Sequence, residues 1–297
     1  MPVPGDVVNG SRSTPSGKEP SNRSGSSEPA EYDAASPRLA FNRVGAGIEI
    51  QLRDNPIVAW MRATNRRELE SVFSPASTLL EIGCGSGADA VSFAKRGIRV
   101  VATDISDQMI EATRDGARAQ GVAGSVLALR GRLSELFEEL SAMPWAPFDG
   151  AYANFSLTYE ESLRSIASLV HSLVRPGARF VFTLPNRLCF TEPLIALARL
   201  RPFAVFDRFR EPRWLVIRDV RVRVRAYTVG EVRRALRGLF EIEQYRGLPV
   251  FMPPSRLYDP SRDRLVRELG ELDNRWDRSP PWRWLGDTTL FRARRIE

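Results

Sequence analysis

Histidine, cysteine and lysine are all scarce in this chain of 297 residues, which contains one histidine and two cysteines. The single histidine, His171, excludes metal sites that depend on several histidine ligands. Cys84 and Cys189 stand too far apart for a zinc-binding spacing and are too few for a disulfide scaffold, which fits a reducing cytoplasm. No run of about 18 apolar residues is present, so we expect no membrane-spanning helix.

The positive charge of the chain is carried almost wholly by arginine. The formal net charge is +7, and Lys18 and Lys95 are the only lysines. This charge reflects a strong preference for arginine, so by itself it says little about binding partners.

Composition separates the N-terminus from the rest of the chain. Residues 1–30 are rich in serine, proline and glycine and are predicted to form a disordered tail, because so few large apolar side chains cannot offset the entropy cost of ordering. They also lack the basic start and apolar stretch of a secretory signal. The whole chain is 43% hydrophobic and 27% charged, which is typical of a globular protein. We therefore expect one folded domain over residues 31–297.

Residues 55–185 alternate between short apolar runs and longer amphipathic stretches. The apolar runs predict strands at 78–82, 99–103, 126–129, 148–153 and 179–184. The amphipathic stretches predict helices at 88–96, 106–120, 133–140 and 160–174, after a first helix that starts at Asn55-Pro56. This alternation predicts βαβ units and a parallel sheet with helices on both faces.

Two stretches interrupt the alternation, at about residues 186–226 and 250–286. The first ends in residues 220–225, where valine and arginine alternate strictly and predict a strand with one apolar and one basic face. Between the interruptions the pattern predicts a helix at 228–238 and a strand at 240–245. A final strand is predicted at 287–296, beside strand 240–245.

Three glycines follow the first predicted strand in the pattern Gly83-x-Gly85-x-Gly87. Glycine permits a positive φ and close approach of a ligand to the backbone, and the following helix directs its first N–H groups to the same place. The pattern lacks the G-K-[ST] of a P-loop and the usual G-x-G-x-x-G of a dinucleotide fold. Asp104 ends the second strand, beside this turn in a doubly wound sheet. A carboxylate there accepts hydrogen bonds from a ribose diol, so we predict a nucleoside-containing ligand.

Four segments together resemble the class I S-adenosylmethionine-dependent methyltransferases, namely residues 81–87, 101–109, 148–155 and 173–180. The resemblance covers about residues 31–185 and resumes at 228–248 and 287–296. It implies a Rossmann-like, doubly wound seven-stranded sheet in an αβα sandwich, with N-terminal helices and substrate-cap insertions at the two interruptions. It also implies S-adenosyl-L-methionine as the cofactor.

The same resemblance assigns cofactor-binding roles to residues at matching positions. Gly83, Cys84 and Gly85 would let the backbone approach the methionine part. Glu81 would orient that turn or the amino group of the cofactor. Asp104 would bind the ribose hydroxyls. The remaining assignments are Ile105 and Met109 beside adenine, Arg132 and Leu133 at the third-strand contact, Asn154 and Phe155 at the methyl-transfer site, and Tyr32 as an aromatic over the cofactor.

Catalysis of methyl transfer needs mainly positioning and exclusion of water, with a base where the acceptor starts protonated. Tyr159 and Glu160, just past the fourth strand, are the candidate catalytic residues. His171 lies in the middle of a predicted helix and is expected to be a satisfied or solvent-facing histidine. Arg132 departs from the acid that the family often has at its position, and arginine cannot accept a hydrogen bond. A backbone contact to adenine is therefore the expectation there.

We predict methyl transfer to a small molecule, by O-, N- or C-methylation. Residues 186–226 hold ten arginines and four acids, 10 − 4 = +6 of the net charge. They are compatible with an anionic substrate, with RNA or with a solvated face, and aromatic residues nearby suit an apolar part of a substrate. Nucleic acid is the less favoured partner because no appended RNA-binding module is present. An RNA methyltransferase and a catalytically idle cofactor-binding or scaffold protein stay as alternatives, and the oligomeric state is left open.

Overall fold

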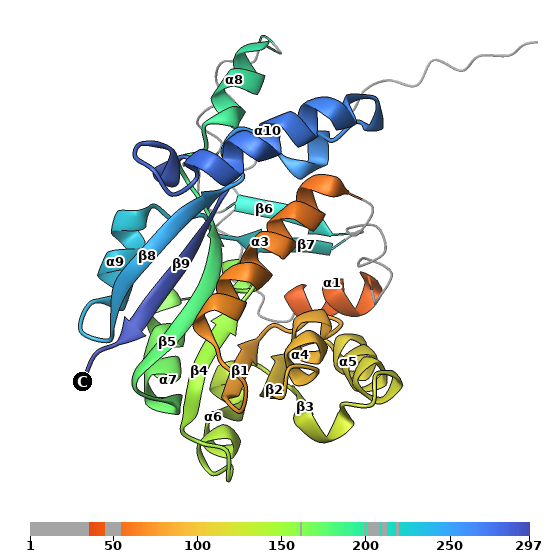
Figure 1. Ribbon diagram of the computed structural model, residues 1–297, viewed down its shortest axis with the longest axis vertical. Helices are drawn as coiled ribbons and strands as arrows, with labels where there is room; N and C mark the ends of the chain where they lie inside the picture. Colours follow the sequence, from red (N-terminus) through yellow and green to blue (C-terminus); the bar gives the residue numbers. More distant parts are fainter. Residues whose placement is uncertain are drawn as a thin grey trace, which may run out of the picture. The chain divides into compact units, whose positions relative to one another are not determined.

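The computed structural model describes residues 36–44, 55–160, 162–198, 200, 208–209, 213–217 and 220–297 (Figure 1). They belong to one compact unit, Asp33–Glu297. The tail expected over residues 1–30 lies outside the described residues. None of the described helices is long and apolar enough to cross a membrane.

A seven-stranded sheet forms the centre of the described unit, in the order β3-β2-β1-β4-β5-β9-β8. The first five strands are parallel, and β9 runs antiparallel to both β5 and β8. This is the doubly wound sheet that the sequence predicts. The strands are β1 (Thr78–Ile82), β2 (Arg99–Asp104), β3 (Val126–Arg130), β4 (Phe148–Ala153), β5 (Val174–Pro185), β8 (Phe240–Leu248) and β9 (Thr288–Arg295).

Alternate residues of the central strands face opposite layers, as a strand period of two requires. In β1, Leu80 and Ile82 pack in one apolar cluster, with α6, α7 and α9, whereas Leu79 packs in a second cluster with α3, α4 and α5. The result is a three-layer αβα sandwich. The helices are α3 (Pro56–Val72), α4 (Ala88–Ala94), α5 (Asp107–Ala119), α6 (Leu133–Ser141), α7 (Leu163–Leu173) and α9 (Val229–Leu236).

Helix starts follow from capping side chains. Asn55 caps α3, because its side-chain oxygen accepts the N–H groups of Ile57 and Val58 at 3.0 and 3.3 Å. α7 begins at Leu163, three residues after the predicted start at 160, because Ser162 is its N-cap and accepts the N–H of Ser165. The prediction that this helix includes position 174 is also wrong, since β5 starts there.

The two interruptions lie outside the sheet and near the carboxyl ends of its parallel strands (Figure 1). The first contains α8 (Thr191–Ala198) and a two-stranded sheet of β6 (Arg213–Ile217) and β7 (Val220–Val224). The second contains α10 (Asp263–Trp276), which packs on α3 through Ile57, Met61 and Val266. An N-terminal helix, α1 (Ser36–Val44), packs on β7. Short 3₁₀ turns complete the fold at Ala123–Ser125, Leu157–Tyr159, Ser255–Leu257, Pro260–Arg262 and Trp282–Trp284.

Strand order reverses between β1 and β4, since β2 and β3 extend the sheet on one side of β1 and β4 and β5 extend it on the other. In open α/β sheets the crevice at such a reversal, beyond the carboxyl ends of the strands, is the preferred place for a ligand.

Candidate functional site

The glycine turn after β1 is closed by hydrogen bonds to the neighbouring strand. The N–H groups of Gly83 and Cys84 both donate to the carbonyl of Thr103, at 2.8 and 2.9 Å. Gly83 has φ +74°, and a Cβ on it would lie 2.2 Å from Cβ of Ser156. No L side chain suits both constraints, so glycine is required here.

Asp104 ends β2 and holds the next part of the turn. One carboxylate oxygen, Oδ2, accepts the N–H of Gly85 at 2.9 Å, and Oδ1 accepts the N–H of Ser106 at 2.9 Å. Burial raises the pKa of Asp104, and these backbone N–H groups oppose that rise by favouring the carboxylate. Each oxygen keeps lone-pair capacity beyond its backbone partner, because an ionised carboxylate has about four acceptor sites.

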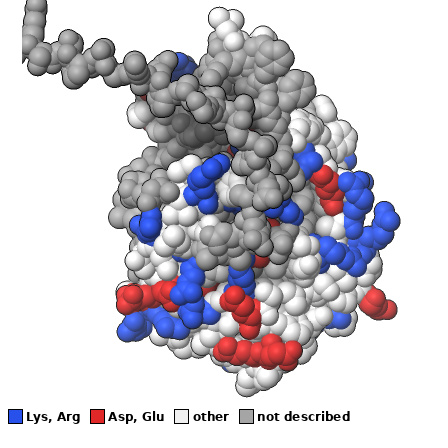
Figure 2. Space-filling view, turned by 180° about the vertical axis from the view of Figure 1, so that it is seen from behind, with Lys and Arg blue, Asp and Glu red and all other residues white. Residues whose placement is uncertain are grey.

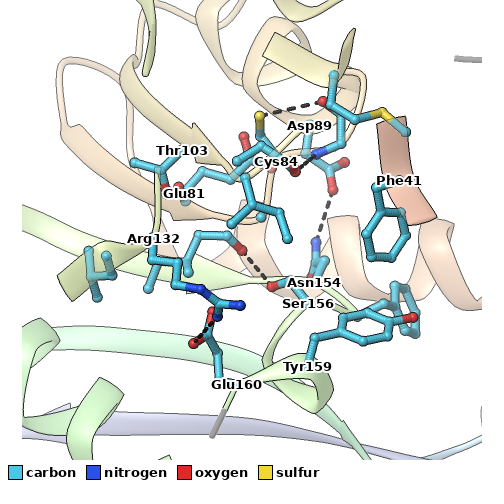
Figure 3. Close-up of a pocket in the computed structure, with 18 of the residues that line it drawn as sticks. Phe41, Glu81, Cys84, Asp89, Thr103, Arg132, Asn154, Ser156, Tyr159 and Glu160 are labelled. Atoms are coloured by element: carbon cyan, nitrogen blue, oxygen red, sulfur yellow. Dashed lines mark hydrogen bonds and ion pairs between the residues drawn. The ribbon is translucent and has the colours of Figure 1, made fainter. Parts of the chain in front are cut away.

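A cavity of about 250 Å³ opens at the carboxyl ends of β1, β2 and β4 (Figure 3). Every predicted cofactor residue within the described part of the chain lines it: Glu81, Gly83, Cys84, Gly85, Asp104, Ile105, Met109, Arg132, Leu133, Asn154 and Phe155. The candidate catalytic residues Tyr159 and Glu160 line it too. Tyr32 lies outside the described residues. The aromatic side chain that the N-terminal region contributes to this wall is Phe41 of α1.

The backbone after β4 is strained where it borders the cavity. Phe155 has φ +58°, in the left-handed region that costs an L residue about 1–2 kcal/mol. Its N–H donates to Oγ1 of the buried Thr183 at 2.6 Å, and Oγ of Ser156 donates to the carbonyl of Ile82 at 2.5 Å. These two bonds hold the chain in this conformation and direct residues 154–156 along the cavity.

A chain of three polar side chains, Arg66, Asp89 and Asn154, crosses one side of the cavity. Oδ1 of Asp89 accepts from Nε and a terminal nitrogen of Arg66 at 3.1 and 2.8 Å. Its other oxygen, Oδ2, accepts from Nδ2 of Asn154 at 2.9 Å. Because a carboxylate only accepts hydrogen bonds, Asp89 fixes the Asn154 amide with its nitrogen toward Asp89 and its oxygen pointing away. This oxygen, Oδ1 of Asn154, is buried and has no hydrogen-bond partner among the described residues.

Sequence reasoning missed Arg66 and Asp89. The only local signal was an acidic residue in the first turn of α4, directly after the glycine turn. Acidic residues are common at helix N-termini because they interact favourably with the helix dipole, so this signal did not indicate a binding role.

The candidate catalytic residues are already engaged with neighbours. Glu160 accepts from Arg132 at 3.3 Å; burial raises the pKa of Glu160, and the arginine opposes that rise. Burial raises the pKa of Tyr159 to about 12, so its phenol is neutral at ordinary pH. The ring of Tyr159 packs edge-on against Phe41, with ring centroids 5.1 Å apart (Figure 3). Phe41 and Tyr159 thereby form an aromatic wall beside the Glu160–Arg132 pair.

Most backbone N–H groups just after β3 already donate hydrogen bonds within the protein. The N–H of Gly131 donates to the carbonyl of Asp104 at 2.9 Å, and the N–H of Arg132 donates to Glu135 at 2.9 Å. Of the three consecutive residues 131–133, these bonds leave Leu133 as the candidate for the backbone contact expected there.

His171, the single histidine of the chain, lies away from this cavity. His171 sits on α7, where Arg295 contacts it at 3.4 Å, and it does not line the cavity. Burial and the nearby Arg295 lower its pKa. Within the described part of the chain, no group of three histidine, cysteine or acidic side chains is placed to hold a metal ion.

Residues 79–177, which run from β1 to the first part of β5, match a family described as "Methyltransferase domain". This stretch of the chain is therefore similar to the domain of a methyltransferase family. Within it lie β1 to β4, the glycine turn, Asp104 and residues 154–160. The seven-stranded sheet continues beyond this match, into β5, β8 and β9.

Similar proteins include fungal enzymes. One is 32% identical over 133 residues, 44% of this chain and 44% of its own length: an S-adenosyl-L-methionine-dependent Diels-Alderase, iccD, from Talaromyces variabilis. Another, O-methyltransferase resE of Aspergillus sclerotiorum, is 31% identical over 142 residues, 47% of this chain and 51% of its own. The chain spans about half the length of the curated relatives it matches.

The fold is shared with a solved methyltransferase. The crystal structure of Burkholderia thailandensis 1,6-didemethyltoxoflavin-N1-methyltransferase, with bound 1,6-didemethyltoxoflavin and S-adenosylhomocysteine, superposes with a TM-score of 0.56. It is 19% identical, and the match covers 89% of each chain. At this identity the likeness shows the αβα architecture.

The residues that line the cavity suit S-adenosylmethionine. The Asp104 carboxylate keeps acceptor capacity for a ribose diol at the edge of the cavity. Ile105, Met109 and Leu133 supply apolar surface beside it. Oδ1 of Asn154 is a buried acceptor without a partner among the described residues, which suits an ammonium donor.

Proposed function

We propose that this chain transfers a methyl group from S-adenosylmethionine to a small molecule. The observation that carries the proposal is Asp104, whose carboxylate is held by the glycine turn at the edge of the cavity and keeps acceptor sites for a ribose. The cytoplasm is the proposed location, supported by two cysteines that are both buried and free.

Two ends of the cofactor are recognised by different residues in this proposal. Asp104 would bind the ribose hydroxyls, and Ile105, Met109 and Leu133 would border the adenine. Asn154 would accept from the α-ammonium, and the N–H groups that open α4 would be donors for the carboxylate of the methionine part. Bound S-adenosylmethionine supplies an electrophilic methyl group on a sulfonium sulfur.

The protein's own contribution is positioning, exclusion of water and control of one proton. Phe41 and Tyr159 form an apolar wall that limits access of water to the cavity. Tyr159 stays neutral below its pKa of about 12 and so acts as a hydrogen-bonding group rather than a phenolate. Glu160 is the proposed base, and its raised pKa favours uptake of a proton from a hydroxyl or amine acceptor.

The proposed acceptor is a small molecule with an anionic or apolar part, in keeping with the arginines and aromatic residues of segment 186–226. RNA is the less favoured acceptor. On the face shown in Figure 2, described acidic and basic side chains are intermingled instead of forming one basic field, and RNA binding depends on such a field.

A second candidate is cofactor binding without methyl transfer. Two observations favour it: Arg132 pairs with the proposed base Glu160, and a relative is named as a Diels-Alderase. Labelled methyl transfer into small-molecule and RNA pools separates the candidates. Label in the small-molecule pool supports the proposal, label in RNA supports the rival acceptor, and cofactor binding with no label in either pool supports the second candidate.

A further inference from the structure

The outward side of α8 is apolar, which is unusual for a surface helix. Leu194 and Leu197 are 52% and 66% exposed, and Leu200, just past the helix, is 88% exposed. Figure 1 shows α8 projecting away from the sheet, beyond α10. Clustered exposed apolar side chains of this kind mark interaction sites.

The first turn of α8 is held to the rest of the domain by a buried arginine. The buried guanidinium of Arg208 donates to both carboxylate oxygens of Glu192, at 2.5 and 2.9 Å. The same guanidinium donates to Asp287 and to the carbonyl of Asn186. Glu192 is the only charged residue of α8, and its carboxylate is paired with Arg208 inside the fold. The helix therefore offers its surroundings almost nothing but apolar surface.

The β6–β7 hairpin of the same interruption combines apolar and basic groups on one face. Trp214 pairs with Arg223 and Val216 pairs with Arg221, so strand alternation places all four on one side. Val216 is 61% exposed, and the guanidinium of Arg221 lies over the Trp214 ring at 5.2 Å. Arginine and tryptophan side by side suit a boundary between water and an apolar phase.

The charge of this interruption indicates the kind of partner. Residues 186–226 carry 10 − 4 = +6 of the chain's net charge of +7. A second copy of the chain would bring its own Arg221 and Arg223 to the contact, and like charges oppose such association. An anionic lipid surface instead offers phosphates for arginine and acyl chains for leucine.

We propose that α8 and the β6–β7 hairpin dock the protein on an anionic phospholipid surface. Leu194, Leu197 and Leu200 enter the boundary between headgroups and acyl chains, and Arg221 and Arg223 bind lipid phosphates. The protein lies on the membrane without crossing it. None of these residues lines the cofactor cavity, so the inference does not depend on cofactor binding.

Vesicle flotation of the full chain tests the inference. Wild type is expected to float with vesicles of phosphatidylcholine mixed with phosphatidylglycerol and to remain unbound with phosphatidylcholine alone. Added salt should release it, because surface charges are screened. Failure of wild type to bind the anionic vesicles overturns the inference.

Two double variants test whether the α8 leucines and the hairpin arginines are responsible for vesicle binding. Leu194→Ser with Leu197→Ser should weaken binding about tenfold or more, since both side chains lose apolar area for insertion. Arg221→Glu with Arg223→Glu should weaken it comparably by charge. Both pairs alter exposed or half-exposed groups, so melting temperature and S-adenosylhomocysteine affinity should match wild type.

The matched control is Leu265→Ser with Leu272→Ser on α10, where the side chains are 49% and 43% exposed. It should bind anionic vesicles like wild type. Equal loss in this control and in the α8 variant would overturn the assignment to α8. A wild-type dimer in sedimentation that the α8 variant abolishes would also overturn the inference, in favour of a second copy as the occupant.

Discussion

Replacing Asn154 by alanine tests the chain Arg66–Asp89–Asn154 and the end of the cofactor that it recognises. In the structure Asp89 holds the amide nitrogen of Asn154 at 2.9 Å and leaves Oδ1 buried and unpartnered among the described residues. If an ammonium donates to this oxygen, the substitution removes one hydrogen bond to a charged group. Such a bond contributes about 1.5–3 kcal/mol, which corresponds to about a 10–150-fold loss of affinity.

A pair of ligands makes this measurement specific. S-adenosylhomocysteine carries the ammonium and carboxylate, whereas methylthioadenosine keeps the nucleoside and sulfur but lacks both. Isothermal titration should show that Asn154→Ala weakens S-adenosylhomocysteine by about 10–150-fold and leaves methylthioadenosine nearly unchanged. Asn274→Ala, on the exposed side of α10, is the matched control and should bind both ligands like wild type.

Two results would refute the reasoning about Asn154. Unchanged affinity for S-adenosylhomocysteine would show that no charged donor meets Oδ1. Equal losses for both ligands would show that the substitution disturbs the cavity as a whole. If wild type binds neither ligand, the proposed cofactor itself is wrong, which is a separate outcome.

Three further predictions concern Asp104, Gly83 and Asp273. Asp104→Ala should weaken both nucleoside ligands about 100-fold or more in titration calorimetry, because two hydrogen bonds to a carboxylate are lost, whereas Asp107→Ala, at an exposed acid nearby, should leave both affinities unchanged. In urea titrations, Gly83→Ala should lower the free energy of unfolding by more than Gly97→Ala does. Both glycines have a positive φ, but only at Gly83 would a Cβ also contact another side chain. Equal losses in the two variants would contradict that contact. Burial raises the pKa of Asp273 from 3.8 to about 6, so protonation of this carboxyl group favours the folded state. The resulting contribution to the free energy of unfolding, at most about 3 kcal/mol, is present at low pH and is lost as pH rises through about 6. Asp273→Asn should flatten this decline in urea titrations at several pH values, and an unchanged dependence of stability on pH would contradict the assignment.

Much of the fold was predictable because its signals are local. Apolar runs and amphipathic stretches predicted the parallel strands and the helices between them, and hydrophobic period depends on neighbouring residues only. The start of α7 was predicted three residues early, because Ser162 competes as an N-cap and its geometry decides the boundary. The strand at 220–225 was also predicted, but its partner β6 was not, since β6 and β7 form a small sheet of their own.

The cofactor side of the site followed from the sequence because its residues stand next to each strand end. Gly83, Gly85 and Asp104 occupy fixed places in a βαβ unit, and the structure brings them together at one cavity. The N-terminal contribution was harder to foresee: Tyr32 was expected, and Phe41 is the aromatic residue of α1 that lines the cavity. A helix joined to the domain by surface contacts has no strand register to fix which residue points inward.

The sequence by itself determined the αβα architecture, the glycine turn and the carboxylate that closes it, because each depends on hydrophobic period, backbone freedom or position at a strand end. Only the tertiary structure decided which distant side chains meet. Arg66, Asp89 and Asn154 are far apart along the chain, and so are Arg132 and Glu160. Their contacts depend on the packing of α3, α4 and the loop after β4 over one edge of the sheet, and no local pattern records that packing.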